Sequence, residues 1–211
     1  MSIVSLASEA RHEAGGMVAG LAVGKVTNNQ DPEGLGRVKL HFHWREDNFE
    51  TDWARIAAPM AGAERGMFFL PEVGDEVLVA FDRDDIRYPY VLGALWSKTD
   101  LPPERNQSGR NDIRIIKSRG GHVVTLDDTK GDGRITIALA DGKKVELTKD
   151  GITASDNTNT IELKANGGTV TITAGSKIAL EAPQISIKAG ARLELNGGGE
   201  LSASAGMVRI N

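Results

Sequence analysis

Short stretches of the chain alternate apolar and polar residues, with almost no helical period. In residues 38–43, Val38, Leu40 and Phe42 are separated by a lysine and a histidine. A period of two indicates a β-strand with one buried and one wet side. Similar stretches follow at 53–58, 66–70, 76–82 and 90–96, with dense turns between them. Five or six short strands of this kind predict a small β-barrel.

Beyond residue 111 the alternation becomes a repeat. Each unit holds two aliphatic residues two positions apart, followed by small or glycine-rich residues, as in residues 169–175 (TVTITAG). From Ile161 onward, successive units begin seven to nine residues apart, a repeat of about eight. Side chains two apart share one face of a strand. Strands this short cannot close a core alone, so we expect the units to stack within one chain or around an axis with other copies.

The expected inward pairs are Ile135/Ile137, Val145/Leu147, Ile161/Leu163, Val170/Ile172, Ile178/Leu180, Ile185/Ile187, Leu193/Leu195, Leu201/Ala203 and Val208/Ile210. The residue between the two members of a pair should point outward, as with Glu162 and Thr171.

Aromatic residues divide the chain in the same place. All ten lie before residue 97, and the remaining 115 residues hold none. An apolar pattern without rings indicates an interior too narrow or too regular to hold them. We therefore predict an N-terminal arm at 1–16, a barrel at 17–96, a polar, proline-containing linker at 97–111 and the repeat region at 112–211.

Charge and composition exclude several functions. The net charge is -4, with -6 over residues 1–96 and +2 over 97–211, so neither part has the cationic face expected of a nucleic-acid-binding protein. The chain has no cysteine, which excludes thiol catalysis and cysteine-ligated zinc. No stretch approaches the roughly 18 apolar residues of a membrane span. Charges within residues 1–16 do not fit a secretory signal, so we expect synthesis in the cytoplasm.

Three groups of residues could in principle bind a metal or take part in catalysis, but each lacks the further residues that such a site needs. His41 and His43 share a strand face but lack further ligands nearby. The acidic turn at 82–85 lacks the remaining ligands of an EF-hand. His122 has Ser118 and Asp127 near it in sequence, yet no Gly-x-Ser-x-Gly motif accompanies it. We expect no catalytic, cofactor or metal site in this chain.

Five blocks of sequence, taken in order, resemble a known family. They are residues 31–39 (DPEGLGRVK), 53–57 (WARIA), 66–79 (GMFFLPEVGDEVLV), 89–96 (PYVLGALW) and 113–122 (IRIIKSRGGH). The first four resemble the oligonucleotide/oligosaccharide-binding (OB) type barrel of contractile-tail spikes, which include phage baseplate assembly protein V, the T-even phage needle and the VgrG-type spikes of type VI secretion. The fifth resembles the entry of that family into its triple-stranded β-helix.

The resemblance implies an all-β homotrimer: three OB-type barrels followed by three chains intertwined into one triple-stranded β-helix, the needle. The residues implied in the trimer core are Ile161, Leu163, Val170, Ile172, Ile178, Leu180, Ile185, Ile187, Leu193, Leu195, Leu201, Val208 and Ile210.

The same resemblance implies partners at both ends. About sixteen residues precede the barrel, which implies a separate hub protein of the baseplate. The chain ends in Val208, Arg209, Ile210 and Asn211 without the His-x-His apex of some phage spikes, which implies a blunt end that binds a PAAR-type tip protein. The linker has no room for the lysozyme of the T-even needle. The implied function is a non-enzymatic spike, assembled in the cytoplasm, that punctures the envelope of a target cell from the tip of a phage tail or a similar particle.

Two other hypotheses remain open. A single-chain β-solenoid could stack the same repeats and bind a polysaccharide or an envelope, with the barrel as the ligand site. An enzyme such as a peptidoglycan hydrolase would need an acid/base pair that the sequence does not show. The mass of the native particle separates a trimer from a single-chain solenoid.

Overall fold

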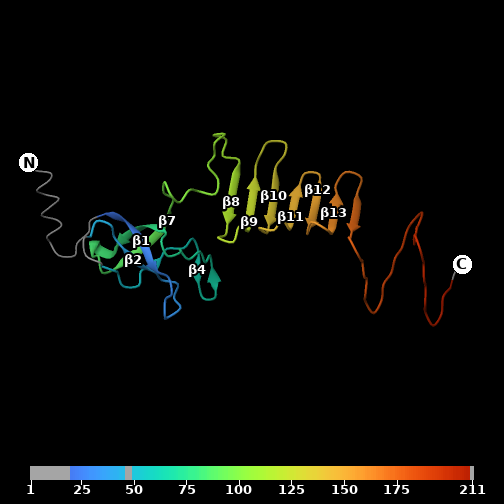
Figure 1. Cartoon of the computed structure of the whole chain (residues 1–211), viewed down its shortest axis with the longest axis horizontal. Helices are drawn as coiled ribbons and strands as arrows, with labels where there is room; N and C mark the ends of the chain where they lie inside the picture. The colour runs from blue at the N-terminus through green and yellow to red at the C-terminus, as the bar shows by residue number, and fades with distance from the viewer. Residues whose placement is uncertain (1–19, 46–48, 210–211) are drawn as a thin grey trace, which may run out of the picture. The chain divides into compact units, whose positions relative to one another are not determined.

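The computed structural model describes residues 20–45 and 49–209. The chain divides between Arg105 and Asn106 into two compact units, a point that falls inside the expected linker. In the described residues the regular structure is β-strand apart from one turn of 3-10 helix, η1 (Asp82–Asp84) (Figure 1). The prediction of an all-β chain is confirmed. The predicted arm at 1–16 lies outside the described residues.

The first unit is built around a five-stranded sheet in the order β2-β1-β6-β7-β3. These strands are β1 (Leu21–Asn28), β2 (Lys39–His41), β3 (Arg55–Ile56), β6 (Glu76–Phe81) and β7 (Pro89–Leu95). The two edges of the sheet meet, because Val38, next to β2, and Ala54, next to β3, exchange backbone hydrogen bonds of 3.1 and 2.7 Å. The sheet thereby closes into a small barrel without a free edge at this point. A separate hairpin, β4 (Ala61–Gly62) and β5 (Arg65–Gly66), completes the unit.

The alternation seen in the sequence fills this barrel. Val77, Val79 and Phe81 of β6 are buried, and the residues between them are only half-buried. The ring of Phe42 lies 5.5 Å from that of Phe81, centroid to centroid, at the centre of the core. Among the described residues, the buried apolar ones are Val26, Val38, Leu40, Phe42, Ala54, Val77, Val79, Phe81, Ile86 and Val91. The barrel therefore supplies its own core.

Thr51 is the buried polar residue within that core, at 2% exposure. Its Oγ1 accepts a hydrogen bond from the backbone N–H of Leu40 at 3.0 Å. Its own N–H donates to the carbonyl oxygen of Leu40 at 2.9 Å. Thr51 thus satisfies both backbone groups of a fully buried residue where no neighbouring strand does so.

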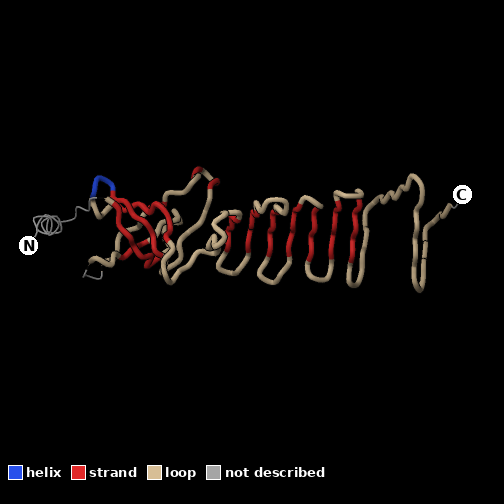
Figure 2. The backbone as a smooth tube through the Cα atoms, turned by 90° about the horizontal axis from the view of Figure 1, so that it is seen from above, coloured by secondary structure: helices blue, strands red, loops and turns tan. Residues whose placement is uncertain are grey.

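The second unit contains one antiparallel sheet of seven strands in simple sequence order. The strands are β8 (Ile113–Lys117), β9 (Val123–Asp127), β10 (Arg134–Ala138), β11 (Lys144–Thr148), β12 (Gly151–Ser155), β13 (Thr160–Lys164) and β14 (Thr169–Thr173). Each strand has five residues and pairs with its neighbours over its full length. Figure 2 shows these strands stacked side by side, followed by a long segment outside any strand.

That last segment, residues 174–209, contains no strand, and its described residues other than Ala174 are exposed. Its backbone therefore lacks the ladder hydrogen bonds that β8 to β14 make within the chain. In the part of the chain that the structure describes, no helix has the length and apolarity of a membrane span.

Replacing Thr51 tests its place in the barrel. Thr51→Val keeps the shape but leaves the buried N–H of Leu40 without an acceptor, which should lower the free energy of unfolding by about 1–3 kcal/mol. Thr51→Ser retains the hydroxyl and should lose less. Urea unfolding followed by tryptophan fluorescence reports on the barrel alone, since all three tryptophans precede residue 97. Equal losses in the two variants would show that the hydroxyl does not matter.

Candidate trimer interface

One face of the seven-stranded sheet is almost wholly aliphatic. The pairing registers place side chains in rows that cross the strands, and two neighbouring rows share this face. The first row, from β9 to β14, is Leu126, Ile135, Leu147, Ile152, Leu163 and Val170. The second row is Val124, Ile137, Val145, Ala154, Ile161 and Ile172. The face is continuous across six consecutive strands.

These aliphatic side chains are uncovered in the single chain. The first row is 38% exposed at Leu147, its least exposed member, and 65% at Val170. On the opposite face of the sheet, the residues between these two rows include threonines and glutamates, such as Thr136, Glu146 and Thr153. These polar residues are half-buried. A sheet whose aliphatic side is more exposed than its polar side requires another surface to cover it.

A groove of about 680 Å³ lies over part of this aliphatic face. Ala154 is the small residue in the second row, between Val145 on β11 and Ile161 on β13. Ile172 on β14 and Ile178 just beyond it also line the groove. Its lining is mainly aliphatic, which suits a packing partner better than a polar ligand.

The structure brings together the first part of the predicted core. Ile161 and Leu163 on β13 lie directly opposite Ile172 and Val170 on β14, all on the aliphatic face. The next eight predicted core residues lie in the segment 174–209, are exposed and are not brought together within one chain. They are Ile178, Leu180, Ile185, Ile187, Leu193, Leu195, Leu201 and Val208. Their role stays a prediction.

The predicted tip-binding end is partly described. Val208 is 55% exposed, and the Nε of the exposed Arg209 donates to the sulfur of Met207 at 3.3 Å. Ile210, a predicted core residue, and Asn211 lie outside the described residues. Tip binding by this end stays a prediction.

Sequence reasoning overlooked two strands of the aliphatic face. Ile152 and Ala154 on β12, and Val124 and Leu126 on β9, were not among the expected pairs, although each pair is spaced by two. The usable signal was the length of the segment between β11 and β13, because it is too long for a hairpin loop and can hold a further strand.

The residues with possible chemistry occupy turns and strand surfaces. The rings of His41 and His43 lie edge to face, 5.9 Å apart, and His41 Nδ1 is 3.2 Å from the carbonyl oxygen of Phe49. His122 Nδ1 accepts a hydrogen bond from the N–H of Ala140 at 3.2 Å, so it belongs to a turn. Among residues 20–45 and 49–209, no three potential ligands gather in a way that could hold a metal ion.

The acidic turn after β6 is held by an ion pair. Arg87 binds both carboxylate oxygens of Asp85, at 2.6 Å for the closest contact. This side-chain hydrogen bond lowers the pKa of Asp85 to about 2. Arg83 and Asp84 both adopt positive φ within this turn, so the backbone there reverses tightly between β6 and β7.

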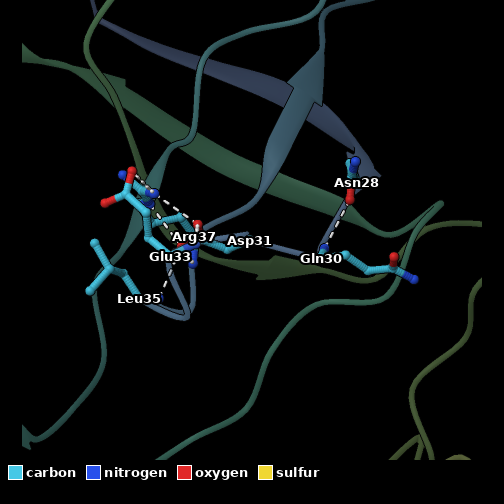
Figure 3. Close-up of polar contacts among 6 residues, drawn as sticks. All are labelled: Asn28, Gln30, Asp31, Glu33, Leu35 and Arg37. Carbon is cyan, nitrogen blue, oxygen red and sulfur yellow. Dashed lines mark hydrogen bonds and ion pairs between the residues drawn. The ribbon is translucent and has the colours of Figure 1, made fainter.

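A second ion pair organises the loop between β1 and β2 (Figure 3). Arg37 contacts both oxygens of Asp31, at 2.8 Å through Nε and 2.7 Å through a terminal nitrogen. The same carboxylate accepts the backbone N–H groups of Glu33 and Leu35 at 3.1 and 3.0 Å. The Arg37 hydrogen bond, helped by these N–H groups, holds the pKa of Asp31 well below its usual range. The side chain of Asp31 is 3% exposed, so this pair is shielded from water.

The chain combines a barrel that has its own core with a sheet whose aliphatic face is exposed. This combination is typical of an all-β protein that assembles with other chains. Two family models identify it more closely. The type VI secretion system/phage-baseplate injector OB domain matches residues 22–96, and the phage baseplate V C-terminal trimerisation domain matches residues 113–194. The chain belongs to this family of baseplate V and VgrG-type spike proteins, as its sequence resemblance predicted.

Curated relatives agree with this assignment. The type VI secretion system spike protein VgrG1b of Pseudomonas aeruginosa is 29% identical over 143 residues, 60% of this chain and 19% of its own length. VgrG2a of the same organism is 40% identical over 72 residues, 32% of this chain and 9% of its own. The actin cross-linking toxin VgrG1 of Vibrio cholerae is 26% identical over 185 residues, 83% of this chain and 15% of its own. The chain thus spans less than a fifth of each of these relatives.

A matched pair of substitutions tests which face of the sheet is covered. Ile152 and Thr153 are neighbours on β12 but face opposite sides. An aspartate at Ile152 would bury a charge without a partner and should cost at least about 3 kcal/mol per chain in the assembled protein. Thr153→Asp, on the polar face, should change stability by less than about 0.5 kcal/mol. Native mass spectrometry and thermal melting measure both, and equal effects would show that the aliphatic face is not an interface.

The Asp31 carboxylate makes a pH-dependent contribution to barrel stability. Because its pKa is lowered in the folded state, the contribution is full above the unfolded value, about 3.9, and is lost as the pH falls toward the folded pKa. Asp31→Asn should lower the urea midpoint at pH 7 and lose less stability than the parent between pH 4 and pH 2. Asp52→Asn, at an exposed position outside the loop, is the control. Parallel pH profiles for parent and Asp31→Asn would contradict this role.

Proposed function

We propose that this chain forms the homotrimeric, non-enzymatic central spike of a contractile injection system. The observation that carries the proposal is the aliphatic face of β9 to β14, which a single chain leaves uncovered and which lies in the match to a trimerisation domain. Three copies that turn these faces toward one axis would bury both rows. The two rows supply aliphatic side chains only, which suits the narrow interior of such a needle.

The two parts of the second unit would enter the trimer differently. Strands β9 to β13 each pair on both sides within the chain, so they need partners only for their side chains, whereas β8 and β14 form the two edges of the sheet. Residues 174–209 have the same eight-residue pattern without ladder partners, so neighbouring copies would supply both hydrogen bonds and apolar contacts. This part of the proposal is the intertwined triple-stranded β-helix with its core at Ile178 through Ile210.

Such a needle suits a mechanical task. Backbone hydrogen bonds that run from strand to strand along its length resist bending and local unfolding, and few sheet edges stay free. The proposed role is to transmit the thrust of a contracting sheath to a target envelope and pierce it. The proposed partners are a hub protein at the barrel end and a PAAR-type tip protein at Val208 to Asn211. Assembly would take place in the cytoplasm, before the particle meets its target.

The mass of the native protein tests the trimer directly. One chain has a mass of 22.5 kDa, so native mass spectrometry should find a particle of three times that value. A monomer would overturn the proposal and favour the single-chain solenoid. Ile187→Asp places three charges at one level of the proposed intertwined region and should shift the particle toward monomer, whereas Ser186→Asp, facing outward, should not.

A further inference from the structure

Several large apolar residues of the barrel are exposed, and the core of the barrel does not explain two groups of them. The first, called the aromatic surface, consists of Leu35, Phe68 and Phe69, which are 64%, 76% and 63% exposed. Phe68 lies over Gly36, where a Cβ would come within 3.2 Å of its ring. Gly36 also adopts φ +68°, so glycine serves both the turn and the close approach of the ring.

Hydrogen bonds fix the two segments that carry the aromatic surface. The Asp31–Arg37 pair fixes the loop that carries Leu35, whose N–H donates to Asp31 (Figure 3). Asn29 Nδ2 donates to the carbonyl oxygen of Pro71 at 3.0 Å and ties this loop to the segment that carries the two phenylalanines. Exposed aromatic side chains on a rigid base are typical of the centre of a protein interface.

The second surface, called the outer sheet surface, consists of Leu21 and Val23 on β1, Leu78 on β6 and Leu92 on β7. Val23 lies directly opposite Leu78, and both alternate with residues that face the core. Leu21, Val23 and Leu92 are 59%, 42% and 45% exposed. The solvent side of a barrel sheet is ordinarily polar, so four neighbouring aliphatic residues there indicate a covered face.

The two surfaces are separate. The outer sheet surface includes the first residues of β1, and the loop that carries Leu35 begins where β1 ends, at Asn28. A strand of eight residues is about 25 Å long, so the first residues of β1 and the loop that follows its last residue lie at opposite ends of the strand. The barrel therefore offers two different apolar contacts on different parts of its surface.

Two different contacts per subunit are what a cyclic trimer needs. In a ring of three, each subunit presents one surface to the next copy and a second surface to the previous copy. We propose that the aromatic surface of one copy packs against the outer sheet surface of the next, which closes three barrels into a ring. This inference rests on the proposed homotrimer. The matched trimerisation domain lies in the same chain, so it would hold three barrels at high local concentration and favour even a modest contact.

Engineered cysteines test the contact, since the chain has none of its own. Phe68→Cys and Val23→Cys are combined in the full chain, which is oxidised or treated with a short bis-maleimide crosslinker and run on a denaturing gel. A covalent link from position 68 of each copy to position 23 of the next closes a ring of three. The control pair is Phe68→Cys with Asp52→Cys, because Asp52 is exposed beside the Val38–Ala54 closure rather than on the outer sheet surface. Each single cysteine substitution is a second control.

The expected result is at least tenfold more covalent trimer from the pair Phe68→Cys and Val23→Cys than from either control. Native mass spectrometry of the same samples separates the two proposals. A native trimer without selective crosslinking, or one in which Phe68→Cys alone gives covalent dimers, would overturn the ring contact and leave the trimeric spike standing. A native monomer in the parent protein would overturn both.

Discussion

A five-stranded barrel can close on itself, and a row of five-residue strands cannot; most of this structure depends on that difference. In the first unit the bridge between Val38 and Ala54 joins the sheet edges, so the apolar side chains face one another. In the second unit the strands follow one another in a single layer, and no described residue of that unit covers their aliphatic side. The same period of two thus yields a finished core in one unit and an open interface in the other.

Much of the fold could be predicted from residue order alone. The alternation around Leu40 and Phe42 marks buried strand positions, and the pairs Ile161/Leu163 and Val170/Ile172 share a face as their spacing requires. The exposure of these pairs in one chain agrees with a repeat that must stack on something else. The absence of rings beyond Trp96 coincides with the change from barrel to layered sheet.

Other features depend on contacts that spacing does not reveal. In the sequence, nothing distinguishes Thr51 from other polar residues. Only the closed barrel shows that it forms hydrogen bonds with the backbone N–H and carbonyl groups of Leu40. The bidentate pair of Asp31 and Arg37 lies within a recognisable sequence block. Its geometry depends on the shape of a loop, which the alternation of apolar and polar residues does not predict. The strand β12 was not predicted, although the segment between β11 and β13 is long enough to hold it. The segment 174–209 keeps its pattern but forms no strand pairing with the described residues of the chain.

The simple sequential order of β8 to β14 has a consequence for the dimensions of the molecule. Neighbouring strands lie about 4.8 Å apart, so each hairpin of two strands extends the stack by about 10 Å. Removing or adding a whole hairpin would preserve the direction of the chain and the identity of both faces, whereas a single strand would reverse the direction. The length of the sheet can therefore change in steps of one hairpin, by duplication or deletion, without a change at either end.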